Sequence, residues 1–290
     1  MMIHAIVVTY NPDLRTLVEQ YDSLNKQVDR IIYVENGSSN SEEAIGFIES
    51  NSSNICIRNT QNLGLGKAQN QGLEKALSLG AEYVLLLDQD SILESGMVAS
   101  LQAVYKKYDS IEKGIAAIGP SFYNTSSKSI SKGSVLKGLS IELVDIETEF
   151  QPVSFCIASG CLIHKDVFAK VGLMREDFFI DALDIEWCLR AKSLGYEVAM
   201  TNKAMMKHSI GEEANNKIEG HSPFREFYIC RNSIAMIGLS HIPIGFKIRR
   251  IFLTHLRILY SLFNLKLEYA KAGIRGCSKG YKYIFNKTIK

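Results

Sequence analysis

Short apolar runs alternate with amphipathic segments through the first third of the chain. The apolar runs are continuous and brief, as is typical of strands buried on both faces, and they cover residues 3–10, 28–34, 55–57 and 83–87. Between them, apolar residues recur at the helical spacing, in segments that cover residues 13–24, 41–48 and 68–79. Strands that alternate with helices across short turns predict a parallel, doubly wound α/β sheet.

The pattern of the remaining chain is less regular but still predicts several elements. We expect strands at 116–120, 153–163 and 196–200, and a surface insertion with a hairpin at 121–150. Asp181 is predicted to cap a helix that Gly195 ends. Gly160 falls inside a predicted strand, where glycine often marks close approach of a ligand or of another backbone. Regularly spaced apolar residues at 244–265 predict a further, amphipathic helix.

Two carboxylates, Asp88 and Asp90, follow directly on the fourth apolar run. In an open parallel sheet, ligands bind just beyond the carboxyl ends of the strands, so both side chains are expected at a ligand site. Carboxylates this close repel each other unless a cation lies between them, and such oxygen ligands suit Mg²⁺ or Mn²⁺. The alternative is an acidic turn that binds nothing, and these residues alone leave it open.

Other candidate positions are less specific. The loop with Gly64 and Gly66 lacks the full patterns of dinucleotide-binding and P-loop proteins, so we expect neither a classical NAD site nor a P-loop ATPase. Asp184 falls in the first turn of a predicted helix, where the helix dipole alone favours a carboxylate. His208 is isolated in the sequence, and a lone histidine is usually a surface or core residue.

The net charge of +2 conceals an uneven distribution. Residues 242–290 contain 11 Lys/Arg and one acid, Glu268, so the tail carries +10 and the remaining chain −8. A basic tail on an acidic body suggests a membrane or a nucleic acid as partner, and because no nucleic-acid module is recognisable we expect no nucleic acid. The helix at 244–265 either lies on a membrane surface or packs on the protein, including a second subunit of a homodimer.

The six cysteines form no C-x-x-C pair, and no signal peptide precedes Ile3, so reduced thiols in a cytoplasmic protein are expected. No uncharged apolar stretch approaches the ~20 residues needed to span a bilayer. We therefore expect a cytoplasmic protein that does not cross a membrane and that, if the helix at 244–265 lies on one, is peripheral on the inner face of the cell membrane.

Taken in order, several segments resemble family 2 glycosyltransferases with the GT-A fold, and among these the rhamnosyltransferases of bacterial polysaccharide and O-antigen assembly. The resemblance spans residues 8–232, about three quarters of the chain, and is carried by residues 8–11, 35–38, 62–64, 88–90, 159–160, 181–190, 208–211 and 228–232. It implies a GT-A domain at 1–235, with a Rossmann-like nucleotide-sugar half at 1–120 and an acceptor half at 121–235. A basic, amphipathic, helical extension would follow at 236–290.

The resemblance also implies roles for individual residues. Asp184 matches the catalytic base, and Asp90, Asp88 and His208 match positions that hold the metal, Mg²⁺ or Mn²⁺. The positions implied for donor or substrate binding are Thr9, Tyr10, Asn11, Glu35, Asn36, Asn62, Gly64, Lys67, Asp88, Gln89, Glu186, Trp187 and Arg231. Two departures from the family pattern matter. Leu183-Asp184 replaces the common Glu-Asp pair, and Glu35 replaces an aspartate.

The activity that the resemblance implies is an inverting, metal-dependent transfer of a sugar to a hydroxyl of a lipid-linked saccharide. The expected donor is a nucleotide-diphosphate sugar, dTDP-rhamnose in the first place. The alternatives are another nucleotide sugar, or a catalytically silent module that binds nucleotide sugars. A nucleotidyltransferase is disfavoured because the first strand is followed by Thr9-Tyr10-Asn11-Pro12 and not by a phosphate loop rich in glycine and basic residues.

Overall fold

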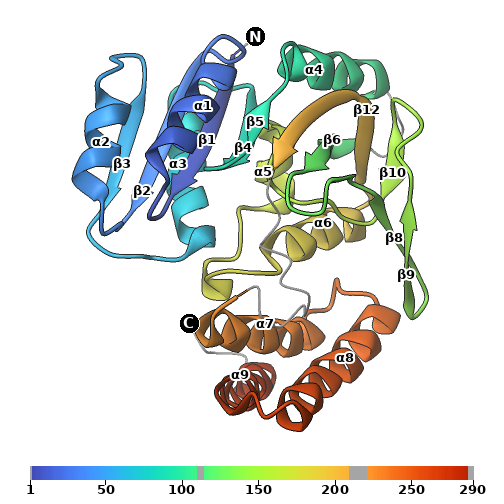
Figure 1. The fold of residues 1–290 in the computed structure, drawn as a ribbon. Coiled ribbons are helices and arrows are strands. Elements are labelled where there is room, and N and C mark those ends of the chain that lie inside the picture. The colour runs from blue at the N-terminus through green and yellow to red at the C-terminus, as the bar shows by residue number, and fades with distance from the viewer. Residues whose placement is uncertain (1, 110–113, 209–220, 287–290) are drawn as a thin grey trace.

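The computed structural model describes residues 2–109, 114–208 and 221–286. Within these residues a ten-stranded sheet runs through the α/β body, and its main path has the order β10-β12-β6-β11-β4-β1-β2-β3 (Figure 1). Its strands are β1 (Ile3–Thr9), β2 (Arg30–Asn36), β3 (Ile55–Asn59), β4 (Tyr83–Asp88), β5 (Ile92–Leu93), β6 (Ile115–Asn124), β7 (Ser129–Ile130), β10 (Gln151–Val153), β11 (Leu162–His164) and β12 (Glu197–His208).

The strands β1 to β4 form a parallel half of the sheet with helices on both faces. β1 pairs in parallel with β2 and with β4, which aligns the ends of β1 and β4 at Val8 and Asp88. In this half, α1 (Leu14–Leu24) and α2 (Ser41–Glu49) cover one face and α3 (Leu65–Ser78) covers the other. Next to β6, β11 and β12, the first face is covered by α4 (Met97–Tyr108) and the second by α5 (Lys165–Val171) and α6 (Leu183–Ser193). The predicted doubly wound α/β arrangement is confirmed here, and α4 was not predicted.

The other half of the sheet is mixed. β11 is antiparallel to β4 and β6, whereas β6 and β12 are parallel. The prediction of one strand at 153–163 was wrong, because β10 ends at Val153 and β11 begins at Leu162. Gly160 turns the chain between them with φ +83°, and its amide donates to the carbonyl of Leu86 at 2.7 Å. A positive φ of this size favours glycine, so the sequence signal at this position marks a turn.

The insertion at 121–150 contains the predicted hairpin, formed by β8 (Gly133–Lys137) and β9 (Ser140–Val144). β12 is longer than predicted and continues to His208. A register shift between Thr201 and Met205 interrupts its pairing with β6, which obscures the alternating pattern of a long strand. This extension is what carries His208 to the end of β4.

Three helices form a layer along one edge of the α/β body: α7 (Pro223–Ala235), α8 (Ile244–Phe263) and α9 (Leu267–Asn286) (Figure 1). The helix predicted at 244–265 is confirmed as α8. Gly276 and Gly280 of α9 lie directly against backbone carbonyls of α7, where a side chain would collide. Two short 3₁₀ turns, at Glu176–Phe178 and Met236–Gly238, precede α6 and α8. No helix in the described part of the chain is long and apolar enough to cross a membrane.

Candidate active site

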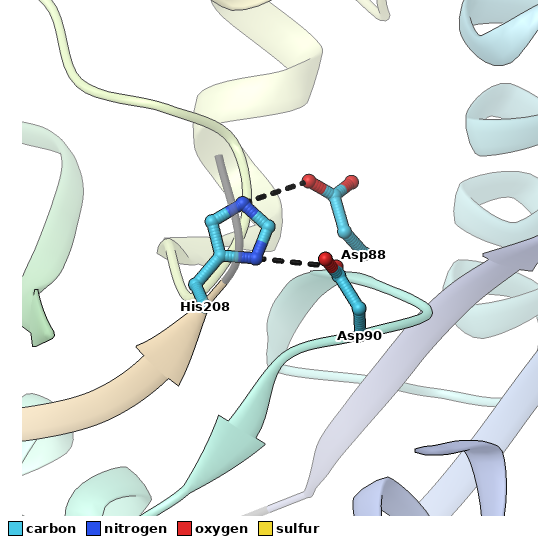
Figure 2. Close-up of side chains that lie close together, drawn as sticks. All are labelled: Asp88, Asp90 and His208. Carbon is cyan, nitrogen blue, oxygen red and sulfur yellow. Dashed lines mark ion pairs between the residues drawn. The ribbon is translucent and has the colours of Figure 1, made fainter. Parts of the chain in front are cut away.

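Two carboxylates and an imidazole meet where β4 and β12 end. Asp88 is the last residue of β4, Asp90 lies in the turn to β5, and His208 ends β12. His208 Nε2 lies 3.6 Å from Asp88 Oδ2, and Nδ1 lies 3.2 Å from Asp90 Oδ1 (Figure 2). Each residue offers one ligand atom, and these atoms lie within 4.8 Å of one another. The predicted pairing of distant segments at this end of the sheet is therefore present.

The charges of this cluster favour a cation. Burial acts to lower the pKa of His208, but the hydrogen bond to Asp90 and the charges of Asp88 and Asp90 outweigh it and raise that pKa. Burial raises the pKa of Asp88, against the opposing charge of His208. Carboxylate oxygens and an imidazole nitrogen are a donor set that suits Mn²⁺ or Mg²⁺, so these three residues fit a divalent cation.

Hydrogen bonds from three polar side chains, Ser159, Ser91 and Gln20, support the residues of the cluster. Ser159 Oγ accepts from the amide of Asp88 at 3.0 Å and lies 2.7 Å from Ser91 Oγ. Ser91 Oγ in turn lies 3.1 Å from His208 Nδ1. The side chain of Gln20, buried in α1, donates to the carbonyl of Asp88. Supported in this way, the ligand atoms lie near one another without requiring the backbone to be strained.

The cluster opens into a cavity of about 510 Å³ whose far wall is the segment that leads into α6. Asp184 lies in this wall, so the cation cluster and the predicted catalytic base border the same cavity. The lining residues are Val8, Tyr10, Asn36, Asn62, Leu65, Gln69, Asp88, Gln89, Asp90, Ile157, Ala158, Phe179, Ile180, Asp181, Ala182, Leu183, Asp184, His208 and Arg225.

The surroundings of Asp184 raise the pKa of its carboxyl group. Burial raises the pKa of its carboxyl to about 6, and the charges of Asp88 and Asp181 add to this effect, while the amide of Ile185 opposes it with a 2.8 Å hydrogen bond. A pKa close to the pH of the cell is what general-base catalysis favours. The carboxylate therefore borders the cavity and has a raised pKa.

The sequence profile described as Glycosyl transferase family 2 matches residues 4–172, more than half of the chain. The chain belongs to glycosyl transferase family 2. It is 31% identical to the dTDP-rhamnosyl transferase RfbF of Shigella flexneri over 301 aligned residues, which cover 97% of this chain and 98% of the relative. The hexosyltransferase Agl10 of low-salt glycan biosynthesis in Haloferax volcanii is 25% identical over 156 residues, about half of each chain.

Solved structures agree with the predicted GT-A fold. The structure of GalNAc-T7 with UDP, GalNAc and Mn²⁺ superposes with a TM-score of 0.62 and 14% identity, over 86% of this chain and 54% of that one. The structure of S. aureus TarS 1–349 with UDP-GlcNAc gives a TM-score of 0.58 and 15% identity, over 96% and 82%. The chain spans about half of GalNAc-T7. At these identities the likeness concerns the fold, and it confirms the GT-A prediction.

Eight of the residues predicted for this glycosyltransferase line the cavity. Beyond Asp184 and the cation cluster, these are Tyr10, Asn36, Asn62 and Gln89. Gln89 accepts from the amide of Tyr10 at 2.8 Å and donates to its carbonyl at 3.3 Å, which ties the β4 turn to the end of β1. Asn36 donates to Asn62 Oδ1 at 3.1 Å, which ties β2 to the loop before α3.

Five further predicted residues are not among those that line the cavity. Thr9 is fully buried. The Glu35 carboxylate accepts from the amides of residues 37 and 38, at 3.2 and 2.7 Å, so it shapes a turn. Asn11 accepts from the amide of residue 39 at 2.7 Å. Gly64, with φ +87°, lies so close to the ring of Phe179 that a Cβ would be 2.6 Å away, and Lys67 forms an exposed ion pair at 2.9 Å.

Three predicted residues lie away from the cavity. Glu186 is buried on another side of α6, 3.0 Å from Arg190. Trp187 packs in the core under the sheet, and its Nε1 donates to the carbonyl of Gly172 at 2.9 Å. Arg231 lines a separate cavity of about 370 Å³ between α7 and α9. Helical geometry explains Glu186, because a residue two positions after Asp184 projects from another side of the helix. Trp187 is three positions after Asp184 and shares its side of α6, but it lies deeper, in the core.

The segment before Asp184 is strained. Phe179, Asp181 and Ala182 have φ values of +61°, +66° and +64°, which side chains other than glycine rarely adopt. The prediction of Asp181 as the helix N-cap was wrong: Ala182 occupies that position, and Asp181 instead pairs with Arg225 at 2.8 Å. Surrounding contacts must impose this conformation.

Asn232 of α7 supplies those contacts. Its fully buried Nδ2 group lies within 2.9 Å of three carbonyls, those of residues 178, 180 and 181. Arg231 donates to Asn232 Oδ1 at 2.9 Å and to the carbonyl of Asp177. The segment 228–232 that carried part of the resemblance therefore holds the Asp184 loop from behind.

Sequence reasoning missed Arg225 and Phe179, which both line the cavity. A signal for Arg225 existed, since Ser222-Pro223 marks a helix start and a cation in the first turn is electrostatically unfavourable there. Such a local conflict often indicates a functional position. Phe179 offered no comparable signal, because an aromatic residue in an apolar context is usually core. The predicted motif residues 209–211 lie outside the described residues.

Proposed function

We propose that this glycosyltransferase transfers L-rhamnose from dTDP-rhamnose to a hydroxyl of a lipid-linked saccharide, with inversion and with a divalent cation. The observation that carries the proposal is the single cavity bordered by the Asp88–Asp90–His208 cluster and by Asp184. The donor is proposed from the 31% identity to a dTDP-rhamnosyl transferase over nearly the whole chain. A lipid-linked acceptor would place the enzyme peripherally on the cytoplasmic face of the membrane.

In the proposed reaction, the acceptor oxygen forms a bond to the anomeric carbon of the donor while the bond from that carbon to the diphosphate oxygen breaks. The proton of the acceptor hydroxyl goes to the carboxylate of Asp184, and the electron pair of the broken bond leaves with the nucleoside diphosphate. A sugar hydroxyl is a poor nucleophile at neutral pH, so a positioned base is required. One base acting opposite the leaving group gives inversion.

The negative charge of the departing diphosphate requires stabilisation. Bound at the acidic cluster, Mg²⁺ or Mn²⁺ would supply a Lewis acid for those oxygens. Asp88, Asp90 and His208 would hold it, and the guanidinium of Arg225 adds positive charge to the same cavity. Tyr10, Asn36, Asn62 and Gln89 are assigned to the nucleotide side of the cavity.

The proposal assigns a different role to each of three segments of the chain. Residues 1–120 would bind the nucleotide sugar, and residues 121–235 would bind the acceptor. The extension 236–290 would attach the catalytic part to its acceptor-bearing surface. Because α7 packs along α9 through Gly276 and Gly280, residues 223–235 belong physically with this helical layer as well.

A donor panel tests the proposal. The enzyme is incubated with dTDP-rhamnose, UDP-glucose, UDP-GlcNAc and GDP-mannose, each with Mn²⁺, with Mg²⁺ or with EDTA, and release of the nucleoside diphosphate is measured. We expect release from dTDP-rhamnose that EDTA abolishes. Release from another donor only would assign a different nucleotide sugar, and binding of dTDP-rhamnose without release in the presence of a saccharide-lipid acceptor would indicate a silent module.

A further inference from the structure

The side of α8 that faces away from the body is apolar along its whole length. Large apolar side chains are exposed there at regular spacing, at Ile244, Ile248, Phe252, Leu256, Leu259 and Phe263. At 3.6 residues per turn these six positions fall within a sector of about 120°. Phe252 is 65% exposed and Phe263 is 85% exposed. His255 is the only polar side chain of α8 in this sector, so the sector is a continuous apolar strip about 30 Å long.

A neighbouring element extends this apolar strip. Leu139, in the turn of the β8–β9 hairpin, is 57% exposed. Its carbonyl lies 3.5 Å from Arg249 Nη1, and the preceding residue touches Gly245, so the hairpin turn abuts the first part of α8. Isolated apolar residues on a surface are ordinary, but a contiguous exposed patch marks a site of interaction.

Cations outnumber acids on α8 and α9, although Arg257 is paired with Glu226 and Glu268 lies in the first turn of α9. The helix α8 contains Lys247, Arg249, Arg250 and Arg257 and no acidic residue. Along α9, four exposed cations recur at helical spacing, and within the described chain none of them is paired with an acid: Lys271, Arg275, Lys279 and Lys282. His255 Nε2 lies 3.5 Å from the hydroxyl of Tyr281, so the exposed sides of the two helices adjoin.

We propose that the apolar strip of α8 inserts into an anionic lipid bilayer while the cations of α9 contact its headgroups. An apolar face flanked by cations matches a lipid surface, which offers hydrocarbon and negative charge together. A second copy of the chain would cover the strip but would bring these unpaired cations together, and like charges in contact are unfavourable. A nucleic acid would pair with the cations and leave the strip in water.

The inner side of α8 connects this surface to the active site. Phe246, on the buried side, belongs to the same apolar cluster as Leu183, the residue before Asp184. A bilayer bound to the outer side of α8 would therefore lie one helix thickness from the catalytic loop. This arrangement deepens the proposed function, because it presents the cavity to an acceptor that is anchored in lipid. Vesicle binding needs no donor, so its result is independent of the donor panel.

Co-sedimentation with vesicles tests the proposal. The full chain is mixed with vesicles of phosphatidylcholine alone and with equimolar phosphatidylcholine and phosphatidylglycerol. We expect binding to the anionic vesicles that weakens with salt, and at least tenfold weaker binding for the double variant Phe252→Glu/Leu256→Glu. The matched control is Ile130→Glu/Leu194→Glu, which changes two equally exposed apolar residues elsewhere and should bind like the wild type.

The headgroup contact is tested by neutralising cations on α9. Lys271→Gln and Arg275→Gln should each weaken binding to the anionic vesicles about fivefold and leave the secondary structure unchanged. Binding that is unaffected by these changes, or equal on both kinds of vesicle, would contradict a role for the cations.

A tryptophan reporter locates the contact directly. The chain has one tryptophan, Trp187, which is buried, so its emission should not respond to vesicles. Emission of Phe252→Trp should shift to the blue on addition of anionic vesicles, whereas emission of Leu194→Trp should not. No shift at position 252 would overturn the proposal. So would a concentration-dependent dimer, seen by light scattering, that Phe252→Glu/Leu256→Glu abolishes while vesicle binding is absent.

Discussion

The two acidic sites that face each other across the cavity are held in different ways. Asp88 and Asp90 follow a regular buried strand, and hydrogen bonds from ordinary turns support them. Asp184 follows a segment in which three side-chain-bearing residues have positive φ, and it depends on Asn232 to hold that segment. The comparison teaches that the sheet holds the residues of the proposed cation site in position. The proposed base is instead held by a strained loop, which the helical layer keeps in its conformation.

The largest effect should come from removing the proposed base. Asp184→Asn keeps the shape of the side chain but cannot accept the proton, so we expect transfer to slow by about 10²–10⁴-fold. The measurement is release of the nucleoside diphosphate in the presence of acceptor and saturating Mn²⁺. Glu186→Gln, on another side of the same helix and outside the cavity, is the comparison variant. A loss of less than threefold for Asp184→Asn would remove this residue from the chemistry.

Changes at the proposed cation site should alter the Mn²⁺ dependence of turnover. Asp90→Asn removes one charge from the cluster, and we expect the Mn²⁺ concentration needed for half-maximal turnover to rise by about 10–100-fold, with partial recovery at high Mn²⁺. Titration of turnover against Mn²⁺ checks this. If excess Mn²⁺ recovers nothing, or if the half-maximal concentration is unchanged, Asp90 does not hold the cation.

The strained segment before Asp184 depends on contacts with α7. Asn232→Ala removes a fully buried amide that contacts three loop carbonyls, and leaving buried carbonyls unsatisfied costs about 1–3 kcal/mol. We expect lower stability in urea and a lower turnover at saturating donor. The half-maximal Mn²⁺ concentration should stay near that of the wild type, because the cation cluster rests on the sheet. If Asn232→Ala raised the half-maximal Mn²⁺ concentration as much as Asp90→Asn does, the conclusion that the two sites are held independently would be wrong.

The raised pKa of Asp184 also predicts a pH dependence of stability. Its folded pKa of about 6 lies above the ordinary value of 3.8, so the folded state binds the proton more tightly. Stability should therefore fall as pH rises from about 4 to 6 and stay reduced above that range, by about 2–3 kcal/mol at most. Asp184→Asn should then be more stable than the wild type at pH 8 in EDTA and equally stable at pH 4, as measured by urea unfolding. The opposite ordering would contradict the assigned environment.

The same contrast explains what the sequence could reveal. Continuous apolar runs located β1, β2 and β4, and the alignment of their ends follows from parallel pairing, so the place of Asp88 was predictable. The turn at Gly160, the register shift in β12 and the positive φ values around Ala182 depend on contacts between distant segments, and no local pattern encodes them. For that reason the prediction of Asp181 as a cap was wrong, and the position of Arg231, which donates to Asn232 and lies outside the cavity with Asp184, could not be foreseen.

Calorimetry of dTDP binding with and without Mn²⁺ tests the central claim most directly, because it separates holding the donor from moving the proton. The account predicts that Asp184→Asn binds dTDP with the affinity of the wild type and keeps the full gain from Mn²⁺, whereas Asp90→Asn loses that gain. Equal loss of the Mn²⁺-dependent affinity in both variants would contradict the separate roles assigned to the two sides of the cavity.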